Sequence, residues 1–280
     1  MFILIDIGGT KTRIVGSKDL ESFSTEKIKF DTPQDFDEWI EMITGKIFEL
    51  VGNDKIEAVA GGIPGEFGED HDTIRSSPNM SSWVGRKVIT ALKEKLDCPV
   101  FLRNDSMMAG LGEATHGAGK GYRIVSYVTV STGVGGSRVI DGAIDEASVG
   151  FEPGQQIIDI DNSICPECKV PSTLEHLVSG TALKHRFGIE PYEVRDPKVW
   201  EELSLWLGYG LSNSILHWSP DILVLGGSMI VGDPAISVDR IRFHIESALK
   251  IFPKIPDIEK SELGDENGLY GSMEYLKSQI

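Results

Sequence analysis

Two glycine-rich turns in this chain have the composition of anion-binding loops. The first, Gly8-Gly9-Thr10, follows the apolar run Ile3–Ile7, and the second, Thr132–Gly136, follows the run Val128–Val130. Both stand between strand-forming segments, and they align at Gly8-Gly9 and Gly135-Gly136 like two copies of one device. Glycine permits positive φ and close approach, so that backbone N–H groups can surround a phosphate. The pair predicts a clamp for a polyphosphate.

A carboxylate stands where a predicted strand gives way to a helix. Residues 100–102 are strand-forming, Asn104 and Asp105 follow, and a helical pattern begins. Ligands of open α/β sheets bind at the carboxyl ends of strands, which makes Asp105 a candidate for chemistry. The competing interpretation is that Asp105 only caps the helix, because Asp and Asn are favoured caps.

Three further polar side chains have the chemistry to bind vicinal hydroxyl groups. They are Glu152, Gln155 and Glu175, and carboxylates and amides form paired hydrogen bonds with such hydroxyls. In an acidic protein most such residues are simply solvated, so each is weak evidence when taken alone.

Cys165 and Cys168 have the two-residue spacing of a zinc or redox pair. No second pair follows, Cys98 is remote, and the six histidines form no metal-binding motif, so the pattern argues against structural zinc. Three cysteines are no disulfide framework, which favours a cytoplasmic location.

Composition narrows the class of ligand. The chain has 280 residues and a formal net charge of −16, which opposes binding to nucleic acid. No segment predicts a membrane span or a signal peptide, since Asp6 interrupts the N-terminal apolar run. A small-molecule ligand is therefore expected.

Strand and helix patterns alternate along the chain, which predicts an α/β fold. The first half predicts helices over 36–50, after a Thr32-Pro33 cap, and over 84–96, with a strand over 56–60. The pattern restarts at Arg123, which places a domain boundary near 115–122. The second half predicts helices over 174–187, 197–217 and 268–280 and a strand over 222–225.

With these residues assembled, the chain resembles sugar kinases of the ROK family (repressor, open reading frame, kinase) in the actin-like ATPase superfamily. The resemblance covers nearly the whole chain and rests on several short motifs in the family's order. They are residues 6–11, 62–65, 78–80, 104–105, 132–136, 152–154, 174–175 with 179–180, and 225–227.

The resemblance implies a two-domain actin-like ATPase fold (ribonuclease H-like) with a central cleft. The domains would span residues 1–117 and 118–266, with a C-terminal helix at 267–280 packing back on the first. It implies ATP-dependent phosphorylation of a hexose hydroxyl, with glucose as the first guess and fructose, mannose or an N-acetylhexosamine as alternatives. ATP and Mg²⁺ would be required, and a homodimer is expected.

Individual roles also follow from the resemblance. Asp105 would be the catalytic base, and Asp6 would position Mg²⁺ through water. The sugar would be bound by Gly65, Asn79, Asn104, Asp105, Glu152, Gln155 and Glu175. The nucleotide would be bound by Asp6, Gly8, Gly9, Thr10, Lys11, Thr12, Thr132, Gly133, Gly135, Gly226, Gly227 and Ser228.

Two positions depart from the family pattern. Gln155 stands where zinc-containing members have a histidine that also contacts the sugar, and Thr173 replaces a cysteine. These changes keep a second hypothesis open, a catalytically inactive ROK-type protein that binds or senses sugar. A structural ATPase like actin is a third, weaker hypothesis. Because family repressors carry an N-terminal DNA-binding helix pair and this chain starts at the first phosphate strand, we expect the enzyme branch.

Overall fold

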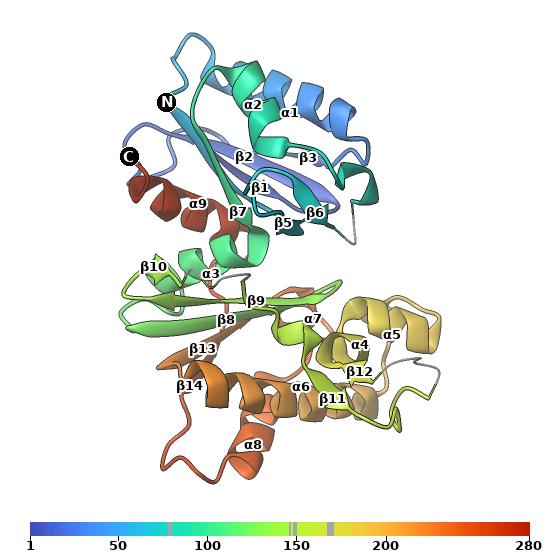
Figure 1. Ribbon diagram of the computed structural model, residues 1–280. Helices are drawn as coiled ribbons and strands as arrows, with labels where there is room; N and C mark the ends of the chain where they lie inside the picture. Colours follow the sequence, from blue (N-terminus) through green and yellow to red (C-terminus); the bar gives the residue numbers. More distant parts are fainter. Residues whose placement is uncertain (78–79, 146, 148–149, 167–170) are drawn as a thin grey trace. The chain divides into compact units, whose positions relative to one another are not determined.

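The chain forms two compact units, each with its own sheet (Figure 1). The computed structural model describes residues 1–77, 80–145, 147, 150–166 and 171–280. Unit 1 comprises residues 1–112 and 265–280, and unit 2 comprises residues 113–264. The chain therefore passes between the units at two points, residues 112–113 and 264–265.

The sheet of unit 1 has the strand order β3-β2-β1-β4-β7. β1 and β2 form an antiparallel hairpin around the first glycine turn, whereas β4 and β7 run parallel to β1. The carboxyl ends of β1, β4 and β7 therefore share one edge of the sheet. The strands of unit 1 are β1 (Phe2–Ile7), β2 (Lys11–Ser17), β3 (Ile28–Asp31), β4 (Ala58–Ile63), β7 (Val100–Asn104) and a separate pair, β5 (Glu66–Phe67) and β6 (Ile74–Ser76).

Helices cover both faces of this sheet, because successive residues of a strand point to opposite sides. Ile3 and Ile5 pack in one cluster with α1 and α2, where the rings of Trp39 and Trp83 lie 4.5 Å apart. Leu4 packs on the opposite face with α9, the C-terminal helix. The helices of unit 1 are α1 (Phe36–Val51), the 3₁₀ helix η1 (Ser81–Trp83), α2 (Val88–Leu96), α3 (Asp105–Thr115, which continues into unit 2) and α9 (Asn267–Lys277).

The helix predicted over 36–50 is confirmed as α1, but its cap differs from the prediction. Asp35 is the N-cap residue, and its side chain accepts a hydrogen bond from the Glu38 N–H. The Thr32 hydroxyl instead donates to the carbonyl oxygen of Gly8 at 2.7 Å. Thr32 therefore supports the first glycine turn rather than the helix.

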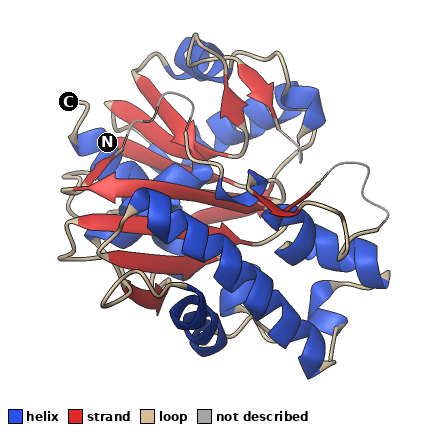
Figure 2. Cartoon of the chain, turned by 60° about the horizontal axis from the view of Figure 1, so that its bottom comes forward, coloured by secondary structure: helices blue, strands red, loops and turns tan. Residues whose placement is uncertain are grey.

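Unit 2 repeats the arrangement of unit 1, with strand order β10-β9-β8-β13-β14. β8 and β9 form a hairpin around the second glycine turn, and β13 and β14 run parallel to β8. Figure 2 shows these strands together with the helices of the chain. The strands are β8 (Ile124–Val130), β9 (Val134–Ile140), β10 (Ala143–Ile144), β13 (Ile222–Gly226), β14 (Asp257–Lys260) and a separate pair, β11 (Ile157–Asp159) and β12 (Ser172–Thr173).

The single helix predicted over 174–187 is wrong, because the structure has two helices that meet at Ser179. The Ser179 hydroxyl caps the second helix at the Ala182 N–H, and the Gly180 N–H donates to the Ser131 carbonyl at 2.7 Å. The predicted helix over 197–217 is confirmed as α6. The helices of unit 2 are α4 (Leu174–Val178), α5 (Gly180–Phe187), α6 (Pro197–Trp218), α7 (Ser228–Val231), α8 (Val238–Ala248) and the 3₁₀ helices η2 (Pro153–Gln155) and η3 (Pro191–Glu193), while η4 (Gly264–Glu266) adjoins α9.

Within the described residues, none of the helices is both long and apolar enough to cross a bilayer.

Candidate functional site

Asp105 lies at the carboxyl end of β7 and is the first residue of α3. Its Oδ1 accepts a hydrogen bond from the N–H of the next residue, Ser106, at 2.8 Å. The Asn104 Oδ1 accepts from the same N–H, two residues further along the chain, which is the geometry of an N-cap. Asn104 is therefore the capping residue, and the interpretation that Asp105 only caps the helix is wrong. Burial, followed by the negative charge of Asp6, raises the pKa of the Asp105 carboxyl to about 6.

Asp6 lies near the carboxyl end of β1, in register with Arg13 on β2 and with Gly62 on β4. Arg13 Nη1 lies 3.1 Å from Asp6 Oδ2, and the same guanidinium also binds Asp265. Burial raises the pKa of Asp6 to about 6, although Arg13 acts in the opposite direction. The guanidinium therefore only partly offsets the cost of burying this carboxylate.

Gly62 keeps a side chain out of the space beside these two acids. A Cβ at Gly62 would lie 3.0 Å from the Cα of Asp105, and a Cβ at Gly268 would lie 2.6 Å from Asp6 Oδ1. β1 and β7 both neighbour β4, so their backbones are roughly 10 Å apart. The fold thus brings two carboxylates from distant parts of the sequence to one edge of the sheet.

Asn104 connects this edge to the loop at Gly65. Its Nδ2 donates to the Gly65 carbonyl at 3.1 Å, and its Oδ1 accepts from the Ser106 N–H at 2.9 Å. Gly65 has a φ of 114°, and a Cβ there would lie 2.3 Å from the Ser76 carbonyl oxygen. Only glycine fits this position, and Asn104 fixes the loop that contains it.

The carbonyl groups of the first glycine turn accept hydrogen bonds, whereas two of its N–H groups donate none within the described residues. The Gly8 carbonyl accepts from the Thr32 hydroxyl, the Thr10 carbonyl accepts from the Thr32 N–H at 2.9 Å, and the Gly9 carbonyl accepts from Gln34 Nε2 at 3.0 Å. Within the described residues the N–H groups of Gly9 and Thr10 have no acceptor. These two N–H groups are therefore available to an anion.

In the second turn, too, the carbonyl groups accept hydrogen bonds whereas some N–H groups have no acceptor among the described residues. The Ser131 carbonyl accepts from the Gly180 N–H, and the Thr132 carbonyl accepts from the Thr181 hydroxyl at 2.8 Å and from its N–H at 3.3 Å. In the part of the chain that the structure describes, the N–H groups of Thr132 and Gly133 have no acceptor. Both turns thus present unpaired donors, as an anion site requires.

The glycines of the turns are needed for close approach rather than for positive φ. Gly8, Gly133 and Gly136 all have φ outside the left-handed region. A Cβ would lie 3.1 Å from the Lys11 carbonyl at Gly8 and 2.6 Å from Glu175 Oε2 at Gly133. Of the two properties of glycine that the sequence suggested, close approach is the one that these three positions use.

Glu175 binds the backbone of the second turn. Its Oε2 accepts from the Val134 N–H at 2.8 Å, and its Oε1 accepts from Gln155 Nε2 at 3.3 Å. Gln155 ends η2, which packs against β9 through Pro153 and Gly154, and the exposed Glu152 precedes it. Glu175 and Gln155 are therefore together beside the turn, as part of unit 2.

The Gly226-Gly227-Ser228 motif forms the end of β13 and the start of α7. Gly227 has a φ of 87°, and a Cβ there would lie 2.3 Å from the Val130 carbonyl oxygen. The Ser228 and Ser131 hydroxyl oxygens lie 3.1 Å apart. The motif therefore adjoins the second turn.

Two predicted nucleotide ligands have other partners in this structure. Lys11 forms an ion pair with Asp31, and the fully buried Thr12 hydroxyl lies 2.9 Å from the Thr32 hydroxyl. Thr12 therefore supports Thr32 rather than presenting its side chain to a ligand.

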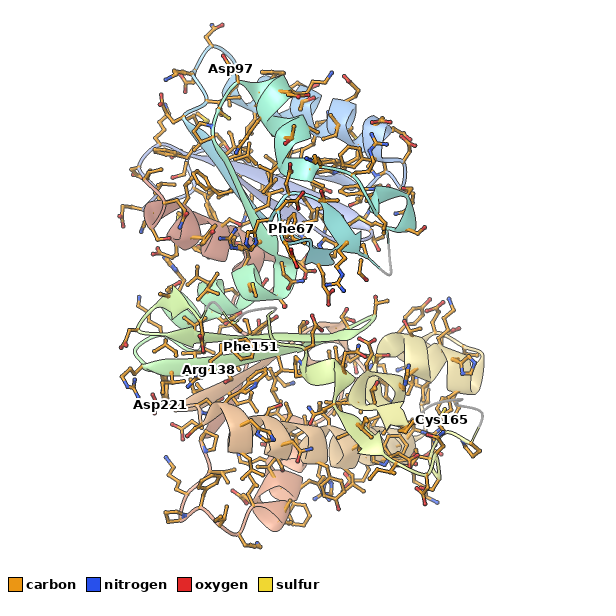
Figure 3. The ribbon with its side chains drawn as sticks, in the orientation of Figure 1. Phe67, Asp97, Arg138, Phe151, Cys165 and Asp221 are labelled. Carbon is orange, nitrogen blue, oxygen red and sulfur yellow. The ribbon has the colours of Figure 1, made fainter. Side chains whose placement is uncertain are left out.

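Two of the predicted site residues lie outside the described part of the chain, and the remaining cysteine of the predicted pair belongs to no metal-binding group among the residues that the structure describes. Asn79 and Cys168 fall outside the described residues. Cys165 lies in the loop before β12 (Figure 3). Among the described His, Cys, Asp and Glu side chains, no three gather as a metal site.

Three residues that support the turns were not predicted from the sequence: Arg13, Gln34 and Thr181. Arg13 follows the first turn on the returning strand, and the register of the hairpin could have paired it with Asp6. Gln34 and Thr181 act through long-range contacts, for which the sequence carries no local signal.

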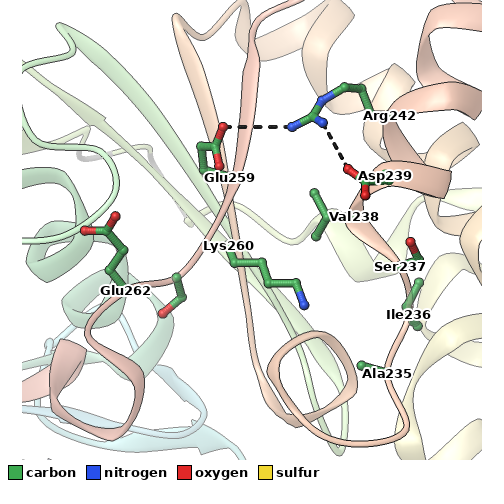
Figure 4. A pocket seen from close by; sticks show the side chains of 10 residues that line it. Ala235, Ile236, Ser237, Val238, Asp239, Arg242, Glu259, Lys260 and Glu262 are labelled. Carbon is green, nitrogen blue, oxygen red and sulfur yellow. Dashed lines mark hydrogen bonds and ion pairs between the residues drawn. The ribbon is translucent and has the colours of Figure 1, made fainter.

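Unit 2 also contains a cavity of about 730 Å³ between the start of α8 and the end of β14 (Figure 4). The Lys260 side chain extends into it, and Arg242 pairs with Asp239 and Glu259 at 3.2 and 3.9 Å. The described residues that line this cavity include none of those predicted to bind sugar or nucleotide.

Comparison with known proteins identifies the family of the chain. The model of the ROK family matches residues 2–279. The glucokinase of Thermotoga maritima is 30% identical over 99% of this chain and 97% of its own, and the N-acetyl-D-glucosamine kinase of Pectobacterium carotovorum is 26% identical over 97% of each. The crystal structure of the ROK hexokinase from Thermus thermophilus is 26% identical, covers 99% of each chain and superimposes with a TM-score of 0.83.

The chain thus has the two-domain actin-like ATPase fold that the family resemblance implied. A family model that matches from residue 2 to residue 279, on a chain that carries both glycine turns and the Asn104-Asp105 pair, leads to one conclusion. The chain belongs to the ROK family.

Proposed function

We propose that this chain is an ATP-dependent kinase that transfers the γ-phosphoryl group to a hydroxyl of a hexose. The observation that carries the proposal is Asp105, a carboxylate at the carboxyl end of a parallel strand with a pKa of about 6. Such a group is ionised at neutral pH and is basic enough to accept the proton of an alcohol as its oxygen attacks phosphorus.

The two glycine turns would bind the phosphates of ATP. Each leaves unpaired N–H groups, at Gly9 and Thr10 and at Thr132 and Gly133, within the described residues. Fixed donors stabilise the charge on the transferring group without reorganising during the reaction. The adjoining motif at Gly226–Ser228 would lie against the adenosine.

The acids of unit 1 fit a hard divalent cation. Asp6 and Asp105 offer carboxylate oxygens, the donors that Mg²⁺ prefers, and positive charge near them would relieve their repulsion. Asp6 would hold Mg²⁺ through water, and the ion would neutralise charge on the phosphates. Arg13 would keep the Asp6 carboxylate in place.

Polar side chains would bind the hexose hydroxyls. The proposed ligands are Asn104, Glu152, Gln155 and Glu175, with Asn79 beyond the described residues and Gly65 contributing backbone. Glucose is the first substrate to test, because one relative in this family is the glucokinase of Thermotoga maritima. Fructose, mannose and N-acetylhexosamines complete the panel, since one changed contact such as Gln155 can shift preference.

The deciding experiment measures ADP release with ATP, Mg²⁺ and each hexose for the wild-type chain and for Asp105→Asn. We expect turnover with at least one hexose, and a loss of about 10²- to 10⁴-fold in Asp105→Asn with sugar affinity nearly unchanged. Asp97→Asn is the matched control, because Asp97 is an exposed acid of the same unit.

Two outcomes would reject the proposal. Full activity of Asp105→Asn would show that Asp105 is not the catalytic base. Binding of sugar and ATP by the wild-type chain without ADP release would favour the non-catalytic sugar-binding alternative.

A further inference from the structure

The peptide groups of the two glycine turns have a shared geometry that links residues outside the turns to the ligand. A carbonyl and the N–H of the next residue belong to one planar trans peptide, so they point in opposite directions. The only cis peptide among the described residues precedes Pro234, so the peptides of both turns are trans. Fixing a carbonyl of the turn therefore fixes the N–H that follows it.

Two side chains hold carbonyl groups whose partner N–H is unpaired. The Gln34 amide donates to the Gly9 carbonyl, whose peptide carries the Thr10 N–H. The Thr181 hydroxyl donates to the Thr132 carbonyl, whose peptide carries the Gly133 N–H. Each side chain thereby orients one of the donors that the structure leaves without an acceptor in its described part.

Gln34 is itself held by the core of unit 1. The indole Nε1 of Trp83 donates to the Gln34 carbonyl at 3.1 Å, and the Ser82 hydroxyl donates to the same oxygen. Trp83 is fully buried against Trp39. The backbone of Gln34 is therefore held by the buried Trp83, although the side chain of Gln34 is exposed.

We propose that Gln34 and Thr181 are positioning residues, one in each unit, that hold the N–H groups of the glycine turns in the direction required by nucleotide phosphates. The inference rests on the proposed function only in taking a nucleotide phosphate as the ligand. Both side chains are exposed, so removing them leaves the cores of the two units intact.

The experiment measures dissociation constants for ADP with Mg²⁺ and for adenosine by calorimetry, using Gln34→Ala, Gln34→Glu, Thr181→Val and Thr181→Ser. We expect ADP to bind about 3- to 10-fold more weakly to Gln34→Ala and Thr181→Val, the loss typical of one hydrogen bond. Adenosine has no phosphate, so its affinity should stay within about twofold. Thr181→Ser keeps the hydroxyl and should restore wild-type affinity.

Charge is tested separately. Gln34→Glu replaces the donor by an acceptor and should weaken ADP binding more than Gln34→Ala does. Gln279→Glu adds the same charge at an exposed position near the C-terminus and is the matched control.

The outcomes separate this inference from the kinase proposal. Unchanged ADP affinity in Gln34→Ala and Thr181→Val, or an equal loss for ADP and adenosine, would overturn the positioning role even if the chain phosphorylates a hexose. Selective loss of ADP affinity would support the role even if no hexose is phosphorylated. If the wild-type chain binds no ADP, the inference is wrong.

Discussion

The charge of Asp6 raises the pKa of Asp105, although Asp6 lies on β1 and Asp105 directly follows β7, on the other side of β4. Burial acts in the same direction on both, and each pKa lies at about 6. Gly62, between them, contributes no side chain that could screen one from the other. Unit 1 therefore holds two carboxylates that are ionised at neutral pH at a cost in stability.

The first prediction concerns the pH dependence of the proposed activity. Asp105 must be ionised to accept a proton, so kcat/KM for the hexose should fall about tenfold per pH unit below the pKa of Asp105. That pKa is about 6 without a bound cation, and Mg²⁺ beside Asp6 would lower it. The profile should be level from pH 7 to 8. Initial rates from pH 4 to 8 at saturating ATP and Mg²⁺ measure this, and a profile still level at pH 4 would contradict it.

The second prediction tests the coupling of the two acids. Asp6→Asn removes a negative charge that raises the pKa of Asp105, so that pKa should fall below about 6. Titration of the side-chain carboxyl by ¹³C NMR measures it directly. Asp70→Asn, which removes an exposed acid held by Thr73, should leave the Asp105 titration in place.

The third prediction is that Asp105→Asn stabilises the ligand-free protein at pH 7.5. The folded pKa of about 6 exceeds the ordinary value of 3.8, so the folded state binds more protons than the unfolded state between these pH values. Stability therefore declines as pH rises from about 4 to about 6, and the full penalty persists above that range. The shift corresponds to roughly 3 kcal/mol at most.

Thermal unfolding with metal and nucleotide removed measures this effect. Asp105→Asn should have the higher Tm at pH 7.5, and the difference should vanish near pH 4. A lower Tm at pH 7.5 would show that the charged form of Asp105 is stabilised by contacts that outweigh its burial.

The fourth prediction concerns Glu113, which is fully buried where the chain enters unit 2. Its two oxygens accept from the N–H groups of Ala118, Glu262 and Leu263 and from the Ser261 hydroxyl. Each oxygen accepts from two donors. In Glu113→Gln one of these oxygens becomes an NH₂ group, which cannot accept a hydrogen bond and would face two donors in either orientation of the amide. We expect a loss of about 2–4 kcal/mol in the free energy of unfolding.

Urea unfolding measures the loss. Glu262→Gln, which changes an exposed neighbouring carboxylate, is the control and should be nearly neutral. Equal stability of Glu113→Gln and the wild-type chain would show that the carboxylate is not required as an acceptor.

The fifth prediction compares two helical glycines. A Cβ at Gly271 on α9 would lie 1.8 Å from the Met108 carbonyl oxygen on α3, whereas a Cβ at Gly45 on α1 meets nothing within 4 Å. Gly271→Ala should therefore cost about 3 kcal/mol or more by forcing the helices apart. Gly45→Ala should stabilise by up to about 1 kcal/mol, because alanine favours the helix. Equal effects of the two changes on Tm would refute the argument.

Much of the fold could be predicted from the sequence because its signals are local. The helices α1 and α6 have apolar residues at helical spacing, and both appear within a residue or two of their predicted bounds. The glycine turns lie between the predicted strands for the same reason. The failures also have local causes: the helical pattern continues through Ser179, and Thr32-Pro33 has the composition of a cap although Asp35 is used.

The sequence by itself determined that two glycine turns and an Asn104-Asp105 pair follow strands, and together with the other short motifs in the family's order these indicated the family. Tertiary structure decided what those residues contact. Gln34 reaches Gly9, Thr181 reaches Thr132 and Glu175 reaches the Val134 N–H only after the sheets have formed. Periodicity and turn chemistry act over a few neighbouring residues, whereas a hydrogen bond across the fold depends on how separate strands and helices pack.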